Sequence, residues 1–222
     1  MARPGTRGCG QKTSDEPAGS AADRARADIL EVATAEFAEH GFAGARVDEI
    51  AAKTQTSKRM IYYYFRDKEG LFTTVLEQGY RQMRALERGL DIDKLDPENA
   101  MRALVAGTFE YQAAHERFVR LVVVENIHRG AHLENTDIAG SLGSGALQTL
   151  GGVYERGVAA GVFRPGISIL HLHMTISALS FFNVSNYATF SLIFNHDMRS
   201  PAALAERRDI VVETVLRYLR NP

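Results

Sequence analysis

The first regular pattern of apolar residues along the chain has the three- and four-residue spacing of one face of an α-helix. Ile29, Ala33 and Phe37 form this stripe, and acidic side chains occupy much of the remaining surface. Gly41 follows as a residue that can take the left-handed conformation at a helix end, with Phe42 placed for the apolar contact that often accompanies it. The pattern predicts an amphipathic helix of about five turns.

Two shorter helices and a longer one are predicted next. The first covers about Val47–Lys53. The second begins at Ser57, a residue type that caps helix N-termini well, and runs to about Tyr64. Asp67 is placed to cap the long helix that follows.

The rest of the chain is also helical in pattern, after an acidic connection that begins beyond Leu90 and contains a proline. The predicted helices cover about 97–114, 117–128, 138–160, 167–190 and 201–219, and glycine or proline lies in most of the gaps. No stretch shows the sustained alternation of apolar and polar residues that is typical of a half-buried strand. The sequence therefore predicts an all-α protein.

Composition is that of a soluble globular protein: of 222 residues, 45% are hydrophobic and 24% are charged. Since Cys9 is the one cysteine, an internal disulfide and a thiolate zinc cluster are excluded. The longest strongly apolar stretch, 167–182, contains His171 and His173 and falls short of the ~20 residues of a membrane span. Because the N-terminus also lacks the apolar run of a secretory signal, we expect a cytoplasmic protein that makes no contact with a membrane.

Residues 1–20 are rich in glycine, proline, serine and threonine, which predicts a disordered tail. Two interpretations stay open: the tail has no role, or Arg3 and Arg7 form a basic arm that reaches into the minor groove of DNA. Beyond it we expect one domain over 21–70 and a second helical domain over 71–222.

The net charge of −1 does not by itself indicate a nucleic-acid-binding protein, but the charge is segregated. Between Lys53 and Lys68 lie five cations and one anion, with three tyrosines among them. The two short predicted helices meet across the turn TQT in the same segment. A scaffold helix, a tight turn and a short basic helix predict a helix-turn-helix, whose second helix enters the major groove of DNA.

The segment FAEHGFAGARVDEIAAKTQTSKRMIYYYFRDKEGLF resembles the DNA-binding domain of the TetR family of bacterial transcription repressors. The resemblance implies an N-terminal three-helix helix-turn-helix DNA-binding domain and a C-terminal helical domain for ligand binding and dimerisation. It also implies a homodimer on a near-palindromic double-stranded DNA operator, from which a small-molecule effector releases it; in a few family members ligand instead promotes binding. Arg46, Arg59 and Met60 depart from the family pattern, so the operator sequence cannot be transferred from a relative.

Candidate DNA contacts follow from the chemistry of this segment. Lys58 and Arg59 lie in the first turn of the second helix, where side chains reach base edges, and arginine is suited to bidentate pairing with guanine. The resemblance places Tyr63 on bases or sugar, and the N-terminal dipole of the next helix adds to Lys68 in holding a phosphate. The predicted DNA-contacting residues are Arg46, Thr56, Lys58, Arg59, Tyr62, Tyr63, Tyr64 and Lys68. The alternative is that the tyrosines belong to the core and the cations to a solvated face.

The last two predicted helices carry the apolar stripes that a dimer interface requires. By the resemblance they pack against their symmetry mates as a four-helix bundle; the alternative is that the stripes face the core of their own subunit. The stripes are Ile169, Leu172, Ile176 and Leu179 on the first helix, and Ile210, Val211, Val215 and Leu219 on the second.

Polar residues inside the apolar C-terminal helices are candidates for ligand contact, because a buried polar group needs a hydrogen-bond partner. They are Tyr111, His115, Glu125, His128, Asn183 and Tyr187, and each could instead be satisfied within the protein. Glu125, His128 and His132 have the residue types of a divalent metal site, but Gly130 interrupts their helix, and we predict neither a metal nor a cofactor.

The C-terminal half is also loosely similar to TetR-type regulators of aromatic and N-heterocycle breakdown, such as those of nicotinate degradation and pyrimidine use. Its several phenylalanines would suit a flat apolar effector that bears one or two polar groups. The sequence contains no G-x-S-x-G, H-E-x-x-H, phosphate-loop or dinucleotide-binding motif, and we do not expect an enzyme. The remaining alternative is a helical adaptor that binds proteins and not DNA.

Overall fold

The computed structural model describes residues 21–54, 56–134, 136 and 138–221, apart from the side chains of 86–88 and 138–143. The predicted disordered tail over 1–20, with Arg3 and Arg7, lies outside the described residues, as does Gln55 of the turn. Within the described part the regular structure is helical, with one isolated bridge between Phe163 and Arg220 and no named strand. No helix of that part is both long and apolar enough to cross a membrane.

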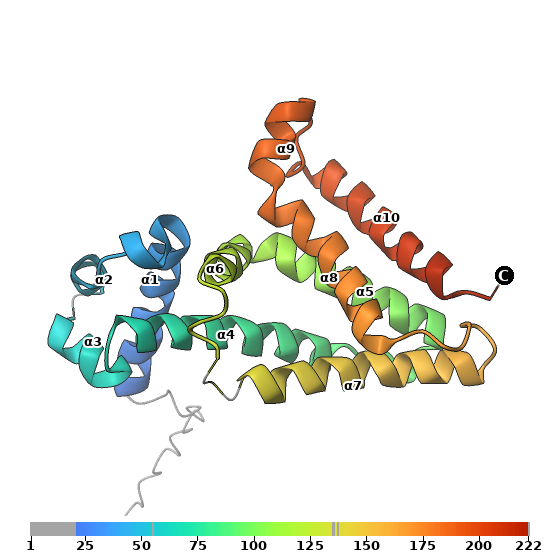
Figure 1. Cartoon of the computed structure of the whole chain (residues 1–222), viewed down its shortest axis with the longest axis horizontal. Coiled ribbons are helices and arrows are strands. Elements are labelled where there is room, and N and C mark those ends of the chain that lie inside the picture. Colours follow the sequence, from blue (N-terminus) through green and yellow to red (C-terminus); the bar gives the residue numbers. More distant parts are fainter. Residues whose placement is uncertain (1–20, 55, 135, 137, 222) are drawn as a thin grey trace, which may run out of the picture.

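Three helices and the start of a fourth form one end of the molecule (Figure 1). They are α1 (Ala21–Gly44), α2 (Val47–Lys53), α3 (Lys58–Phe65) and the long α4 (Lys68–Gly89). After a 3-10 turn at Ile92–Lys94, the other end consists of α5 (Pro97–Ala114), α6 (Glu116–Ile127), α7 (Ile138–Ala159), α8 (Ile169–Ser185), α9 (Tyr187–Phe194) and α10 (Pro201–Leu219). The all-α architecture predicted from the sequence is confirmed.

The boundaries of the first helices have local causes. Gly41 breaks α1 with a φ of 68°, a conformation that glycine adopts without a steric penalty, and one short turn follows to Gly44. The Ser57 side chain accepts a hydrogen bond from the amide of Met60 and caps α3. Asp67 accepts one from the amide of Gly70 at 2.7 Å and caps α4, as predicted.

The N-terminal core is built from the inward faces of α1 to α4. Phe37, Ile50, Ile61 and Phe72 are each 0% exposed and belong to one apolar cluster. Leu121 of α6 belongs to the same cluster, so the two ends of the molecule share packed surface. Since α4 also continues without a break from one end to the other, a change in the C-terminal half has a direct mechanical route to the first three helices.

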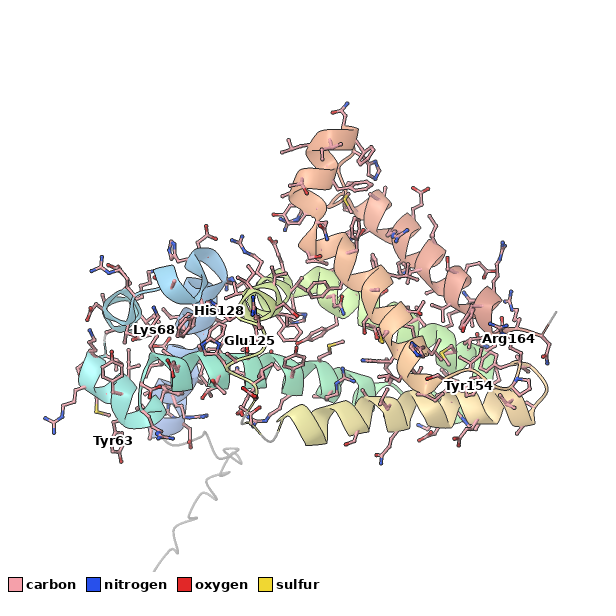
Figure 2. All side chains as sticks on the ribbon, viewed as in Figure 1. Tyr63, Lys68, Glu125, His128, Tyr154 and Arg164 are labelled. Atoms are coloured by element: carbon pink, nitrogen blue, oxygen red, sulfur yellow. The ribbon has the colours of Figure 1, made fainter. Side chains whose placement is uncertain are left out.

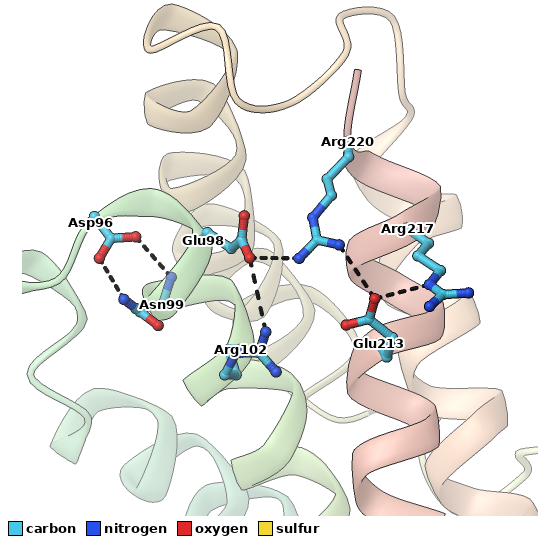
Figure 3. A network of polar contacts seen from close by, with 7 residues as sticks. All are labelled: Asp96, Glu98, Asn99, Arg102, Glu213, Arg217 and Arg220. Atoms are coloured by element: carbon cyan, nitrogen blue, oxygen red, sulfur yellow. Dashed lines mark hydrogen bonds and ion pairs between the residues drawn. The ribbon is translucent and has the colours of Figure 1, made fainter. Parts of the chain in front are cut away.

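The C-terminal core lies around α5, which packs against α7, α8 and α10 (Figure 1). Its buried members include Val105, Leu172, Val211 and Leu216. An ionic network ties the start of α5 to the end of α10 (Figure 3): Arg220 bonds Glu98 at 2.6 Å and also bonds Glu213 at 3.3 Å. These charges are partly solvated, so they fix the register of the two helices more than they stabilise the fold.

The connection from α7 to α8 is held by one hydroxyl. The Tyr154 hydroxyl donates to the carbonyl of Arg164 at 2.8 Å and accepts from the amide of Ile167 at 3.0 Å (Figure 2). The Phe163 ring packs against Gly157, where an added Cβ would lie 1.9 Å from a ring carbon. Glycine is therefore required at that position for the loop to fold back on α7.

One predicted helix is two helices in the structure. The stretch expected to be continuous over 167–190 breaks at Asn186, whose backbone has φ −113° and ψ 1° and whose side chain donates to Ser185 Oγ. Asn and Ser compete with helical hydrogen bonds through their own side chains, and a periodicity of apolar residues does not register this. The break turns α9 into a short projecting helix (Figure 1).

The apolar stripes proposed for dimerisation are mostly internal. Five of their eight residues are buried in the core of their own subunit: Leu172, Ile176, Val211, Val215 and Leu219. The neighbouring faces are the exposed apolar ones, at steps of four residues along each helix. They present Leu170, Met174 and Phe182 on α8, and Ile210 and Tyr218 on α10.

Candidate DNA-binding surface and ligand sites

The helix-turn-helix is assembled by burial of a few apolar side chains. Ile50 and Ala51 of α2 face inward, and Ile61 and Phe65 hold α3 against α2 and α4. Because these anchors lie four residues apart on α3, the opposite face of that helix is turned to solvent. The basic and aromatic residues of the segment lie on that exposed face.

Tyr63 is 78% exposed and Tyr62 is 37% exposed, so neither ring belongs to the core. Arg59 is exposed in the first turn of α3. Lys58 is exposed too, but its ammonium lies 3.0 Å from a carboxylate oxygen of Asp48 on α2, which raises the pKa of Lys58 through that hydrogen bond. Arg59 and Tyr63 are thus the more available pair for a partner.

The remaining predicted contacts are more tied to the protein. Tyr64 is half-buried, with its ring against Phe65. Thr56 donates its hydroxyl to the carbonyl of Thr54 at 3.3 Å. Arg46 lies before α2 with its guanidinium 3.9 Å from Glu49, and both side chains are largely exposed.

Lys68 is held beside the turn between α1 and α2. Its ammonium donates to the carbonyl of Ala43 at 3.4 Å and lies 5.1 Å from the centre of the Phe42 ring. Partial burial lowers the pKa of Lys68. The side chain therefore has a defined position and does not extend freely into solvent.

A residue that the sequence analysis did not single out organises this region. Glu36 of α1 has a side chain that is 3% exposed, and it accepts hydrogen bonds from Lys53 Nζ at 2.9 Å and from the amide of Arg46 at 3.3 Å. Burial alone would raise the pKa of Glu36, but these two hydrogen bonds and the charges of Lys53 and His40 bring it below its usual range. Glu36 thus supplies the cap that Arg46 cannot, because it binds the backbone amide at the start of α2.

Replacing Glu36 with glutamine is expected to reduce the free energy of unfolding at neutral pH by roughly 1 kcal/mol. The folded-state pKa of Glu36 lies below the ordinary 4.5, so its contribution is complete above that pH and is lost as pH falls through the folded value. Urea unfolding of both proteins across this range measures the difference. A gap between wild type and E36Q that stays constant into acid would contradict the assignment.

The predicted ligand residues do not gather in one place. The Tyr111 hydroxyl donates to the carbonyl of Gly79 at 3.2 Å, and its ring stacks on His115 at 3.9 Å between centres. Burial raises the pKa of Tyr111. The Tyr187 hydroxyl donates to Glu116 at 3.1 Å. His115 and Glu116 line an open cleft of ≈ 660 Å³ between α1, α4 and the corner where α5 meets α6.

Glu125 and His128 lie at the far end of α6, next to the N-terminal helices (Figure 2). Glu125 is bonded to His132, at 2.7 Å from ring Nδ1 and 2.8 Å from the backbone amide. His128 meets the rings of Phe42 and His132. Among the described residues no group of three acidic, histidine or cysteine side chains is arranged to hold a metal ion.

Asn183 is 4% exposed and lies on the inward face of α8 together with Ser180. Gln112 of α5 is equally buried, and in the described part of the chain neither Gln112 Oε1 nor Ser180 Oγ has a hydrogen-bond partner. These two residues were missed because a single Gln or Ser in an apolar helix gives no periodic signal. They lie one turn beyond Thr108 on α5 and Ile176 on α8, which line a cavity of ≈ 20 Å³.

The fold and the exposed basic face of α3 define a helix-turn-helix DNA-binding regulator. Residues 29–75 match the family described as bacterial regulatory proteins of the tetR family, and residues 97–215 match the tetracyclin repressor-like C-terminal domain. The chain belongs to the TetR family, and the resemblance stated from the sequence is confirmed.

Relatives extend this likeness over most of the chain. The HTH-type transcriptional repressor NicS of Pseudomonas putida is 37% identical over 200 residues, which are 90% of this chain and 94% of NicS. A regulatory protein of the tetR family from Rhodococcus RHA1 has a TM-score of 0.72 at 21% identity, covering 90% of this chain and 98% of that one. The regulator FadR from Bacillus subtilis, solved in complex with stearoyl-CoA, shares the fold with a TM-score of 0.65 at 16% identity, covering 87% and 98%.

Proposed function

We propose that this regulator is a cytoplasmic repressor that binds a near-palindromic operator as a homodimer and leaves it when a small molecule binds the C-terminal half. The observation that carries the proposal is the exposed face of α3, with Arg59 and Tyr63 directed away from the anchors Ile61 and Phe65. In this arrangement α3 occupies the major groove, and the two copies reach successive grooves on one face of DNA, about 34 Å apart.

The contacts divide by chemistry into base readers and phosphate binders. Arg59 pairs with guanine O6 and N7, and Tyr63 contacts the neighbouring base or sugar. Lys68 and the hydroxyls of Tyr62 and Tyr64 bind phosphate oxygens. Lys58 first has to leave Asp48, so we assign it a smaller share of the binding energy. Arg46 and Thr56 are peripheral phosphate contacts.

The dimer forms through the exposed apolar faces of α8 and α10. Leu170, Met174 and Phe182 share one face of α8, and Ile210 and Tyr218 share one face of α10, which packs beside it. Contiguous apolar surface of this kind marks an interaction site on a protein. Two copies related by a two-fold axis would cover all of it as a four-helix bundle.

The effector binds between α5 and α8, at the seam that contains Gln112, Ser180 and Asn183. FadR, which shares the fold, is a family example solved with a ligand. Oxygens without partners cost free energy that a ligand's hydrogen-bond donors would recover. Burial and then the charge of Arg84 lower the pKa of His173, which lines the adjacent cavity, so its imidazole is neutral at physiological pH. A compact, flat, uncharged compound with hydrogen-bonding groups fits this lining.

Because Gln112 Oε1 has no partner to lose, Gln112→Leu is expected to leave the free energy of unfolding unchanged or to raise it by about 1 kcal/mol. The same change should weaken the effector's release of the repressor in a reporter strain. The control is Gln82→Leu, since Gln82 borders the open cleft and not this seam. A destabilised Q112L protein, or one with a normal effector response, would contradict the site.

The experiment that tests the function is selection of genomic DNA fragments by the purified protein, followed by sequencing. Enrichment of one palindromic site would support the repressor, and the adjacent genes would indicate the class of effector. The Lys58→Ala, Arg59→Ala double variant should enrich nothing. If the wild type enriches no site with or without added small molecules, the chain does not act as an operator-binding repressor, and the adaptor becomes the better interpretation. Nothing in the geometry favours an enzyme over a regulator.

A further inference from the structure

The connection between α6 and α7 makes a second contact with the DNA-binding end that the proposed function does not use. We propose that Glu125 and His132 are positioning residues for DNA binding, which hold Lys68 in place through the ring of Phe42. This inference rests on the proposed function in one respect, namely that Lys68 binds a phosphate. Lys68, Glu125 and His128 lie where this connection approaches α1 and α4 (Figure 2).

The first link in this contact is between Glu125 and His132. Glu125 is 3% exposed, and its two oxygens bind the amide and the ring of His132 at 2.8 and 2.7 Å. The hydroxyl of Thr73 on α4 donates to the carbonyl of His132 at 3.3 Å. His132 is thus fixed at its amide, its carbonyl and its ring. A carboxyl group is costly to bury, and here both of its oxygens serve to orient one residue of a loop.

The second link is an aromatic junction formed by Phe42, Phe72, His128 and His132. The ring of His132 lies 4.4 Å from that of Phe42 and 4.9 Å from that of Phe72, between centres. His128 meets Phe42 edge-on at 5.6 Å. Tilted and edge-on arrangements at these distances are favourable between aromatic rings. The loop therefore packs on the residue that directly follows the kink at Gly41.

The third link is between Phe42 and Lys68. The ammonium of Lys68 lies 5.1 Å from the centre of the Phe42 ring, within the range of a cation–π contact, and it donates to the carbonyl of Ala43. Both interactions depend on the position of the turn that Phe42 anchors. If His132 no longer supports Phe42, the turn and the ammonium both lose their fixed position. Lys68 would then have to be ordered again on DNA, at a cost in affinity.

The test uses the full-length protein and a duplex that contains the genomic site selected above. His132→Ala and Glu125→Ala are expected to weaken binding about twofold to thirtyfold. Across roughly 50 to 200 mM salt they should also lower the salt slope toward that of Lys68→Ala, which loses about 0.9 per phosphate contact. Glu125→Gln can still accept from the amide and donate to the ring, so it should restore binding. Glu134→Ala, an exposed change in the same loop, is the matched control.

Two measurements separate positioning from a merely structural role. In a double-mutant cycle the losses from His132→Ala and Lys68→Ala should be non-additive, because both act on the same phosphate contact. Without DNA, the backbone amides of residues 42–46 should exchange faster in His132→Ala, while those of α10 remain as protected as in the wild type. Additive losses, a wild-type salt slope in a folded H132A, or unchanged exchange would overturn the inference.

The failure of the inference and of the proposed function give different results. If Lys68→Ala flattens the salt slope and His132→Ala does not, the positioning role is wrong and the phosphate contact stands. If Lys68→Ala leaves the slope unchanged while the wild type binds its site, the role of Lys68 and the inference fall together, and the repressor stands. If the wild type selects no DNA, the proposed function fails first, and the inference fails with it.

Discussion

Replacing Arg59 with alanine is expected to weaken operator binding roughly 30-fold to 10,000-fold. One bidentate arginine–guanine pair contributes about 1–3 kcal/mol of discrimination, and a dimer loses the pair in both half-sites. Arg59 is exposed on the first turn of α3, and no ion pair or hydrogen bond within the described residues holds it away from DNA. The loss should therefore appear in binding with little change in stability.

The measurement is binding of the purified variant to its selected site and to a library of single-base changes in that site. Arg59→Ala should accept any base at one position per half-site, which is the mark of a lost base contact. Arg59→Lys keeps the charge and loses the bidentate geometry, so it should retain the salt dependence and still lose part of the preference. If Arg59→Ala selects the same sequence as the wild type, Arg59 is not a base reader.

Phe37→Ala is expected to lower the free energy of unfolding by about 3–5 kcal/mol, enough to unfold the N-terminal helices in part of the population. The ring is 0% exposed and packs edge-on against Phe72, with centres 5.0 Å apart, and it also stacks against Phe42. Its removal leaves a cavity where α1 and α4 meet, beneath the aromatic junction. DNA binding should be lost together with the fold of this end.

Chemical denaturation followed by circular dichroism measures this change. Phe194→Ala is the matched control, because the side chain of Phe194 is 61% exposed on α9 and its loss should cost little stability. The first loss of helix in Phe37→Ala should occur over 21–76, which hydrogen exchange can localise. A variant that stays as stable as the wild type would contradict the central place of Phe37 in this core.

Local sequence signals determined the helices because their causes are local. Ser57 and Asp67 cap the helices that were predicted to begin there, and Gly41 interrupts α1 as its position indicated. The spacing of Ile61 and Phe65 is enough to show which face of α3 is buried, and therefore that Tyr63 is exposed. The motif around these residues also carried the family, which the comparisons confirm.

Only the tertiary structure decided which partner each polar side chain meets. Glu36 binds the start of α2, Tyr111 binds Gly79, and Glu125 binds His132, so each is satisfied within the protein. Helical periodicity gives the face of a residue and not the neighbour opposite it, which depends on how helices distant in sequence are packed. For the same reason the apolar stripes of α8 and α10 were visible in the sequence, but which stripe is internal and which is exposed was decided by the packing of α5 between them.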